Sequence, residues 1–324
     1  MYTLSDCQSI INKHIRQMQL PVIPKNLYEP MQYLLNLEAK RIRPAMVLMG
    51  CNVFSDDIEQ AVFPALAIEV FHNFTLMHDD IMDHSERRRN NLTVHMKWNT
   101  NVAILSGDAM LIKAYELLNR VHRDTLPQIL PVFNQTALQV CEGQQYDMDY
   151  ENRTEVTLDE YLKMITYKTA VLLAASLKIG ALLGGGTDED SNLLYEYGKN
   201  LGIAFQLQDD LLDVFADPDI FGKVTGNDIV TNKKTILLVE ALRTASGAKR
   251  KELLHWLSQA GFNKDEKVKA VSNIYTELDI PNKVKEHIDQ YHRLAINSLE
   301  RLSKVSARKA ALLSFADYLL HRKK

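Results

Sequence analysis

The chain reads Leu76-Met77-His78-Asp79-Asp80-Ile81-Met82-Asp83 at the end of a long apolar stretch. Its three aspartates stand at positions i, i+1 and i+4. Side chains four residues apart lie on one face of an α-helix, so Asp79 and Asp83 are predicted to present their carboxylates together, with Asp80 beside them. Because like charges at this spacing repel each other, the sequence also predicts a positively charged partner.

The same spacing returns in the second half of the chain, in Gln206-Leu207-Gln208-Asp209-Asp210-Leu211-Leu212-Asp213. A single acidic cluster of this kind is usually a solvated helix face. Two such clusters, each embedded in apolar sequence, indicate a chemical role that the two share.

The composition is that of an ordinary soluble globular protein, with 46% hydrophobic and 24% charged residues in a chain of 324. The formal net charge of −3 provides no basic field that would indicate a nucleic-acid partner. Three widely separated cysteines favour a reducing compartment, the cytoplasm, and offer neither a disulfide framework nor a metal site. No apolar run is long enough to predict a transmembrane segment.

Helical periodicity runs nearly from end to end, and strand signals are scarce. We predict a single all-α domain over residues 1–324, a bundle of ten or more helices. A polar loop is expected at 86–91 and little helix at 217–232, followed by four or five amphipathic helices from 233 onward. A helix after residue 57 is expected to carry the first aspartates. Further helices are expected over 5–20, 26–39, 45–54, 99–121, 124–146, 158–183 and 190–215.

Six aspartates in two clusters suit Mg²⁺, which prefers carboxylate oxygen and usually binds through one or two carboxylates together with substrate phosphates. Cations stand near both clusters, and arginine and lysine are the usual partners of phosphate. We interpret the pattern as sites for two anions, one bound through Mg²⁺ and the other bound directly. The cations are Lys40, Arg41, Arg43, Arg87, Arg88 and Arg89 around the first cluster, and Lys168, Lys223, Lys233 and Lys234 around the second.

These motifs together resemble those of the trans-isoprenyl diphosphate synthases of the polyprenyl synthetase family. The two acidic clusters match the DDxxD motifs of that family, the first followed by Arg88-Arg89 and the second preceded by Phe205-Gln206. The other matches are Lys40-Arg41-Ile42-Arg43-Pro44, Gly143-Gln144-Gln145-Tyr146-Asp147, Lys168-Thr169, Gly222-Lys223, and Gly226-Asn227-Asp228-Ile229 with Lys233. The chain departs from the family where Glu38-Ala39 replaces two glycines and where Asn90-Asn91-Leu92 lacks the usual glycine and proline.

The resemblance implies an all-α fold around a central cavity, a homodimer, and two diphosphate substrates held with three Mg²⁺ ions. It implies that Asp79, Asp83 and Asp209 ligate Mg²⁺ against an allylic diphosphate, with Asp80, Asp210 and Asp213 in support. Arg88, Lys168, Lys223 and Lys233 would also hold this diphosphate. Isopentenyl diphosphate would be held by Lys40, Arg43, His72 and Arg89. Thr169 and Gln206 would line the place where the carbocation develops, and Arg322-Lys323-Lys324 could close over the second site.

The reaction that follows is a chain-elongating prenyl transfer. In the implied reaction, Mg²⁺ and the cations would stabilise the departing diphosphate as the allylic C–O bond ionises, the held isopentenyl double bond would attack, and a proton would be lost to the released diphosphate. In this family, the residues four and five before the first aspartate help to set the product length. Here they are Thr75 and Phe74, which resemble a short-chain synthase making C20 geranylgeranyl diphosphate; C15 farnesyl diphosphate or a longer product is the alternative.

Other enzyme classes use the same fold class. Glu69-x-x-His72 and Glu252-x-x-His255 have the spacing of di-iron bundles, which are also all-α. Terpene cyclases share the all-α fold and one DDxxD motif. A regulatory subunit without activity is disfavoured because both aspartate motifs are complete.

Overall fold

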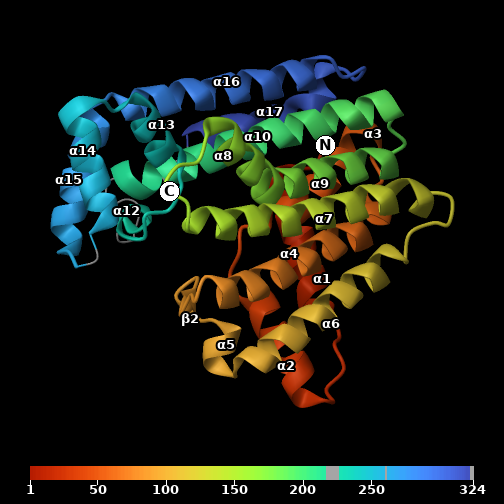
Figure 1. The fold of residues 1–324 in the computed structure, drawn as a ribbon. Helices are drawn as coiled ribbons and strands as arrows, with labels where there is room; N and C mark the ends of the chain where they lie inside the picture. Colours follow the sequence, from red (N-terminus) through yellow and green to blue (C-terminus); the bar gives the residue numbers. More distant parts are fainter. Residues whose placement is uncertain (217–225, 260, 322–324) are drawn as a thin grey trace. The chain divides into compact units, whose positions relative to one another are not determined.

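The computed structural model describes residues 1–216, 226–259 and 261–321, and nearly all regular structure within them is helical (Figure 1). The predicted all-α fold is confirmed. The earlier elements are α1 (Leu4–Gln17), α2 (Lys25–Asn36), α3 (Ile42–Phe54), the 3-10 turn η1 (Glu59–Ala61), α4 (Val62–Met82), β1 (Arg87–Arg88), β2 (Asn91–Leu92), α5 (Val94–Lys97) and α6 (Thr100–Leu118). The later elements are α7 (Leu126–Glu151), α8 (Leu158–Ile165), η2 (Thr166–Ala170), α9 (Val171–Leu183), α10 (Asp188–Phe215), α12 (Asn227–Val230), α13 (Ile236–Thr244), α14 (Gly247–Ser258), α15 (Lys264–Glu277), α16 (Ile280–Glu300) and α17 (Ser306–His321).

Local side-chain chemistry sets several helix starts. Thr3 begins α1 with a capping box, in which its hydroxyl accepts from the N–H of Asp6 and the Asp6 carboxylate accepts from the N–H of Thr3. Thr157 and Glu160 repeat this arrangement at α8. Each box satisfies two backbone donors that the first helical turn would otherwise leave without a partner.

Two sequence predictions need correction. The helix expected over 158–183 is interrupted by a π-helical turn, η2, which separates α8 from α9. The loop expected at 86–91 contains a short antiparallel hairpin, in which β1 pairs with β2. Neither feature has a periodicity that a run of this length reveals.

The chain divides into two compact units. The first comprises residues 1–135, 172–195 and 302–312, and the second comprises 136–171, 196–301 and 313–324. Each is described below by itself, and the single domain expected over 1–324 stays a prediction.

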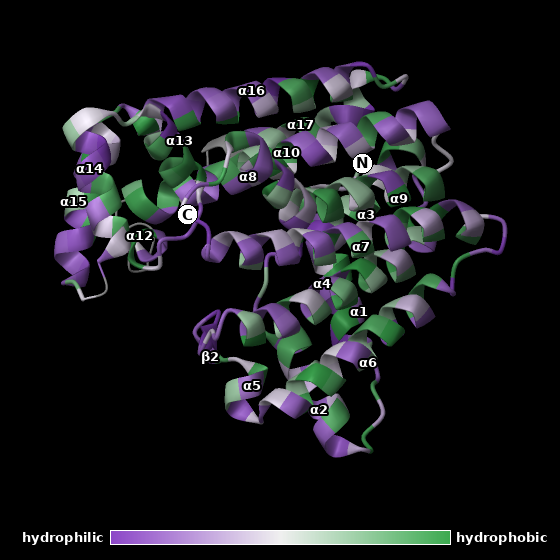
Figure 2. Ribbon diagram, viewed as in Figure 1, coloured by the Kyte–Doolittle hydropathy of each residue, from purple (hydrophilic) through white to green (hydrophobic). Residues whose placement is uncertain are grey.

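The first unit has its core around α3 and α4. Helix α4 packs against α6 and α3, while α1 packs on α3 and α2 on α6. Ten consecutive residues of α3, from Pro44 to Val53, are buried, as is most of α4. The hydrophobic colouring of these helices in Figure 2 agrees with their inner position in the unit. The aspartates at the end of α4 thus stand on a helix that the core holds firmly.

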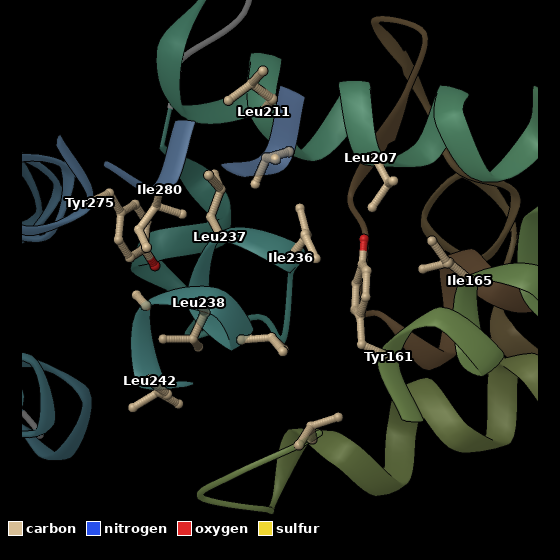
Figure 3. Close-up of a cluster of buried hydrophobic side chains, with 14 of the residues drawn as sticks. Tyr161, Ile165, Leu207, Leu211, Ile236, Leu237, Leu238, Leu242, Tyr275 and Ile280 are labelled. Atoms are coloured by element: carbon tan, nitrogen blue, oxygen red, sulfur yellow. The ribbon is translucent and has the colours of Figure 1, made fainter. Parts of the chain in front are cut away.

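The second unit has its core around α13. Helix α13 packs against α8, α15 and α16, and α15 packs against α12 and α14. Figure 3 shows the aliphatic side chains of α13 facing those of neighbouring helices, with Leu207 and Leu211 on α10 and Tyr161 and Ile165 on α8. Because α10 contributes Leu207 and Leu211 to this core, it also fixes the aspartates that lie between and beside them.

One helical segment, Leu158–Leu183, is long and apolar enough to cross a membrane by length and composition. Of the 18 residues that form its most apolar stretch, 67% are buried inside the protein. Core helices of globular proteins meet the same two criteria, so this segment alone is weak evidence for a membrane span.

Candidate active site

The first aspartate motif ends α4, and its middle carboxylate is turned into the protein. Asp80 is 2% exposed, and both of its oxygens accept from Nε of Arg88, at 2.9 and 3.0 Å. Nη2 of the same guanidinium lies 2.8 Å from Asp80 and 3.9 Å from Asp79. Burial raises the pKa of Asp80, and Arg88 counteracts that rise. Arg88 is therefore the positive partner that the spacing of the aspartates predicts.

The hairpin that follows presents Arg88. Arg88 pairs with Asn91 across the two strands, and the turn consists of Arg89 and Asn90, with φ of 51° and 64°. Two positive φ values suit the tight turn of a two-residue hairpin, and asparagine tolerates them better than most residues that are not glycine. Asn90 stands where the family pattern has glycine, so the departure noted in the sequence keeps a residue compatible with this backbone.

The second aspartate motif repeats this arrangement. Asp210 is 5% exposed and accepts from the hydroxyl of Tyr161 at 2.6 Å, from Nε2 of Gln206 at 2.9 Å and from the N–H of Ile236 at 3.2 Å. Burial raises the pKa of Asp210, and these three donors oppose the rise. Successive residues of a helix are about 100° apart, whereas residues four apart are only about 40° apart. The second aspartate of each motif can therefore point into the core while the first and last share a more exposed face.

The outer aspartates are the more accessible members of each motif. The side chain of Asp79 is 21% exposed, Asp83 is exposed, and Asp209 and Asp213 are partly buried. Asp213 also anchors the start of α12, because its Oδ2 accepts from the N–H of Asp228 at 3.1 Å. Within the described residues, no three histidine, cysteine, aspartate or glutamate side chains gather closely enough to hold a metal alone. Partly exposed carboxylates without a closed ligand set fit a Mg²⁺ ion that takes its other ligands from phosphate and water.

The π-helical turn η2 carries Lys168 and Thr169, and π-turns are frequent at functional sites. Nζ of Lys168 donates to Oδ2 of Asp147 on α7 at 2.5 Å. The hydroxyl of Thr169 donates to Oε1 of Gln206 at 3.2 Å, and Gln206 in turn donates to Asp210. Asp147 stands in the matched motif that begins at Gly143, but the motif spacing alone predicts no role for it.

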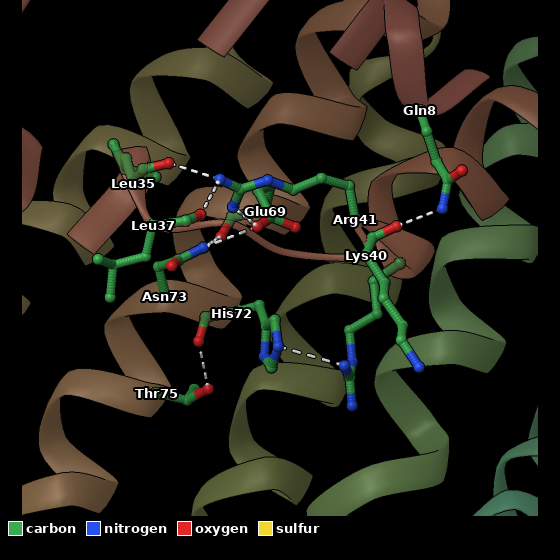
Figure 4. Close-up of polar contacts among 10 residues, drawn as sticks. Gln8, Leu35, Leu37, Lys40, Arg41, Glu69, His72, Asn73 and Thr75 are labelled. Carbon is green, nitrogen blue, oxygen red and sulfur yellow. Dashed lines mark hydrogen bonds and ion pairs between the residues drawn. The ribbon is translucent and has the colours of Figure 1, made fainter. Parts of the chain in front are cut away.

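A second group of cations, Arg43 and Arg89, lies around His72 in the first unit. Nη1 of Arg43 lies 3.2 Å from Nε2 of His72 (Figure 4), and the electrostatic influence of Arg89 reaches both. Burial, together with Arg43 and Arg89, holds the pKa of His72 well below its ordinary value, so the imidazole is neutral at pH 7. Within the described part of the chain, neither guanidinium has a carboxylate at ion-pair distance, and Nε of Arg43 is buried without a hydrogen bond.

Arg41, between the two predicted phosphate ligands Lys40 and Arg43, has a structural role. Its guanidinium is buried against the carboxylate of Glu69 and the carbonyl groups of Leu35 and Leu37 (Figure 4). Arg41 is the N-cap residue of α3 and has a positive φ of 45°. Glu69 therefore has a cationic partner, and so has Glu252, which pairs with Lys249. The buried pairing of Glu69 with Arg41 disfavours the di-iron interpretation.

The residues predicted to set product length lie on α4. The ring of Phe74 is partly buried, with its centroid 5.6 Å from that of Phe71 and 4.9 Å from that of His78. The hydroxyl of Thr75 donates to the carbonyl of His72 at 2.8 Å, one turn earlier in the same helix. Of these two residues, only Phe74 has a large apolar side chain that could contact a prenyl chain.

The remaining predicted residues are unevenly placed. Lys233 is exposed three residues before the start of α13, and Lys40 is exposed two residues before the start of α3. Lys223 and Arg322-Lys323-Lys324 lie outside the described residues. The assignments of all these residues to substrates stay predictions.

Comparison with known proteins identifies the family. The polyprenyl synthetase family model matches residues 24–275. The geranylgeranyl diphosphate synthase of Methanosarcina mazei is 38% identical over 94% of this chain and 92% of its own, and that of Sulfolobus acidocaldarius is 37% identical over 93% and 92%. A crystal structure of a geranylgeranyl pyrophosphate synthase superposes with a TM-score of 0.95 at 40% identity, covering 100% of both chains.

The chain belongs to the polyprenyl synthetase family. It is a prenyltransferase whose substrates are isoprenoid diphosphates, as the motifs predict.

Proposed function

We propose that the protein condenses isopentenyl diphosphate with allylic diphosphates and makes C20 geranylgeranyl diphosphate as its main product. The observation that carries the two-substrate part is the division of the cations in the first unit. Arg88 neutralises the aspartate motif, whereas Arg43 and Arg89 have no carboxylate partner within the described residues. Guanidinium groups that lack a carboxylate at ion-pair distance and lie beside a neutral imidazole favour the direct binding of a phosphate group.

The aspartate motifs suit the other diphosphate. We propose that Asp79, Asp83 and Asp209 hold Mg²⁺, while Asp80 and Asp210 position the helices that carry them. When bound, Mg²⁺ would supply positive charge that stabilises the departing diphosphate. That three ions bind is an expectation from the family resemblance.

The contacts around η2 support a role in ionisation of the allylic substrate. Asp147 orients the ammonium of Lys168, a cation suited to a phosphate oxygen. The single hydroxyl proton of Thr169 is donated to Gln206. The lone pairs of the Thr169 oxygen therefore stay available to face a developing carbocation. Because Gln206 is fixed by Asp210, this polar pair needs little reorganisation as charge develops.

The proposed product length rests on Phe74 and on the relatives. An aromatic ring five residues before Asp79, held between Phe71 and His78, is suited to limit the space for a growing prenyl chain. The geranylgeranyl synthases described above are similar over nearly the whole chain. The alternative is a C15 or a longer-chain synthase with the same chemistry.

The test is an elongation assay of the purified protein with Mg²⁺, isopentenyl diphosphate and, separately, C5, C10 and C15 allylic diphosphates. Sizing of the dephosphorylated products is expected to give a C20 endpoint. Products of C30 or longer would leave the transferase chemistry in place and remove the proposed limit at Phe74. Cyclised hydrocarbons in place of prenyl alcohols would contradict chain elongation.

We further expect a homodimer in the cytoplasm, both from the resemblance. An apolar face on α6 supports the dimer, since Leu105 and Ile112 are 61% and 62% exposed and lie on one side of the helix with Ile104. Light scattering coupled to size exclusion measures the mass directly. A Leu105→Glu variant is expected to be monomeric.

A further inference from the structure

Lys233 follows a residue with an uncommon backbone conformation. Asn232 has φ of 56°, in the left-handed region that asparagine tolerates and most residues avoid. Such a conformation persists where the surrounding groups hold it. The direction in which the chain presents Lys233 therefore depends on what holds Asn232.

Two buried lysines hold Asn232 by its two carbonyl groups. Nζ of Lys267 on α15 donates to the side-chain Oδ1 at 2.7 Å, and Nζ of Lys234 donates to the backbone carbonyl at 3.2 Å. Nδ2 of Asn232 donates to the carbonyl of Leu257 on α14 at 3.0 Å. Both polar atoms of the Asn232 side chain are thereby fixed by helices that pack behind the loop.

Burying the charged side chain of Lys267 costs folding free energy. Its side chain is 0% exposed, burial lowers its pKa, and among the described residues no carboxylate forms an ion pair with it. Its ammonium contacts the Phe262 ring at 4.1 Å and the carbonyl of Val230 at 3.5 Å. A buried ammonium costs free energy unless hydrogen bonds compensate it, and an apolar residue would pack there at lower cost. Lys267 thus has a task beyond filling the core.

The loop that contains Asn232 is attached to the second aspartate motif at both ends. At its start, the N–H of Gly226 donates to the carbonyl of Asp213 at 2.7 Å. At its end, the N–H of Ile236 donates to the Asp210 carboxylate. Between these anchors, the N–H of Lys233 donates to the carbonyl of Asp228 at 2.9 Å. Because both ends of the segment are anchored, a displacement of Asn232 is expected to move its neighbour Lys233.

We propose that Lys267 and Asn232 are positioning residues, which orient Lys233 toward the diphosphate of the allylic substrate. The proposal rests on the role given to Lys233 in the proposed function. Under this proposal Lys267, a buried residue on α15, does not contact substrate itself and acts through Asn232 on Lys233.

The test is a double-mutant cycle in steady-state kinetics with Mg²⁺. Lys267→Met, Asn232→Ala and the double variant are compared by kcat and by KM for each substrate, with Lys233→Ala setting the scale. Each single variant is expected to raise the KM for the allylic diphosphate about tenfold, the equivalent of one charge-assisted contact. The double variant is expected to add little, because both changes remove one interaction. The KM for isopentenyl diphosphate is expected to stay within about twofold, since Lys233 is proposed to contact the allylic diphosphate and not isopentenyl diphosphate.

Two matched variants sharpen the cycle. Lys269→Met removes an exposed lysine from the same helix and is expected to behave as wild type. Asn232→Gly keeps the left-handed backbone without strain and is expected to recover part of the loss seen with Asn232→Ala. This comparison tests the proposal even if Lys267→Met fails to fold.

The outcomes separate the two proposals. If Lys233→Ala raises the KM for the allylic diphosphate while Lys267→Met and Asn232→Ala leave it unchanged, the positioning role is wrong and the proposed function stands. Additive losses in the double variant, or equal rises in KM for both substrates, would also overturn the positioning role. If Lys233→Ala itself has no effect on that KM, the role of Lys233 in the proposed function fails, and the positioning proposal with it.

Discussion

Lys168 donates a 2.5 Å hydrogen bond to Asp147, and this contact ties the π-helical turn η2 to α7 within the second unit. A lysine has a flexible stem and three donors, so its position depends on the acceptor that it finds. Here the acceptor is a carboxylate on a long helix, which gives Asp147 a role that the motif spacing alone does not define.

We expect Asp147→Asn to lower kcat/KM for the allylic diphosphate about tenfold with little change in folding stability. The amide keeps the shape of the side chain but loses the charge that strengthens the bond to Lys168. Asp149→Asn, an exposed change on the same helix, is the control for a general effect of lost charge. Equal activities of the two variants would show that Lys168 does not need Asp147.

Arg88→Met is expected to destabilise the protein by about 3 kcal/mol at pH 8, because it leaves the buried carboxylate of Asp80 without its cation. Loss of Arg88 raises the folded-state pKa of Asp80 further above its unfolded value. The folded variant then binds the proton more tightly, so its deficit against wild type shrinks as pH falls. Denaturant unfolding at pH 5 and pH 8 measures this difference. Arg87→Met, beside it and exposed, controls for lost surface charge, and an Asp80→Asn, Arg88→Met pair is expected to regain most of the stability.

Asp228 gives a pH dependence of its own in metal-free protein. Burial raises its pKa to about 7, and Asp213, Asp210 and Asp147 add to the rise while Lys233 opposes it. The folded state therefore holds a proton between about pH 4 and pH 7 that the unfolded state has lost, so stability falls as pH rises through this window. We expect Asp228→Asn to be more stable than wild type at pH 8, by up to about 4 kcal/mol, and nearly equal to it at pH 4. Unfolding curves in EDTA that run parallel at all pH values would contradict this.

The sequence predicts much of the fold and part of the site, for reasons that particular residues make clear. Helical periodicity predicts α4 and α10, and the i, i+1, i+4 spacing sets Asp80 and Asp210 apart from their neighbours on a helix. The spacing does not reveal that Arg41 is buried against Glu69 while Arg43 lies beside His72, since the two differ only in tertiary contacts. The same holds for Asn232 and Lys267, which meet through folding and belong to no shared motif.

Phe74→Ala is expected to shift the products toward longer chains, because it removes the ring held between Phe71 and His78. Phe63→Ala, near the start of the same helix, removes a partly buried ring far from the aspartates in sequence and is the matched control. Product sizing by chromatography measures the shift. An unchanged product length in Phe74→Ala would remove Phe74 from the control of chain length.

Gly143→Ala is expected to impair catalysis through η2. A Cβ at Gly143 would lie 2.6 Å from the backbone carbon of Tyr167 and still closer to the N–H of Lys168, and backbone atoms cannot move aside as a flexible side chain does. The turn that presents Lys168 and Thr169 must therefore shift away from α7, and the bond between Lys168 and Asp147 with it. We expect at least a tenfold loss of kcat/KM, since small displacements of positioning groups are costly. Gly261→Ala, where a Cβ meets nothing within 4 Å, is the control and should keep full activity. A fully active Gly143→Ala variant would show that the close approach of α7 to η2 is dispensable.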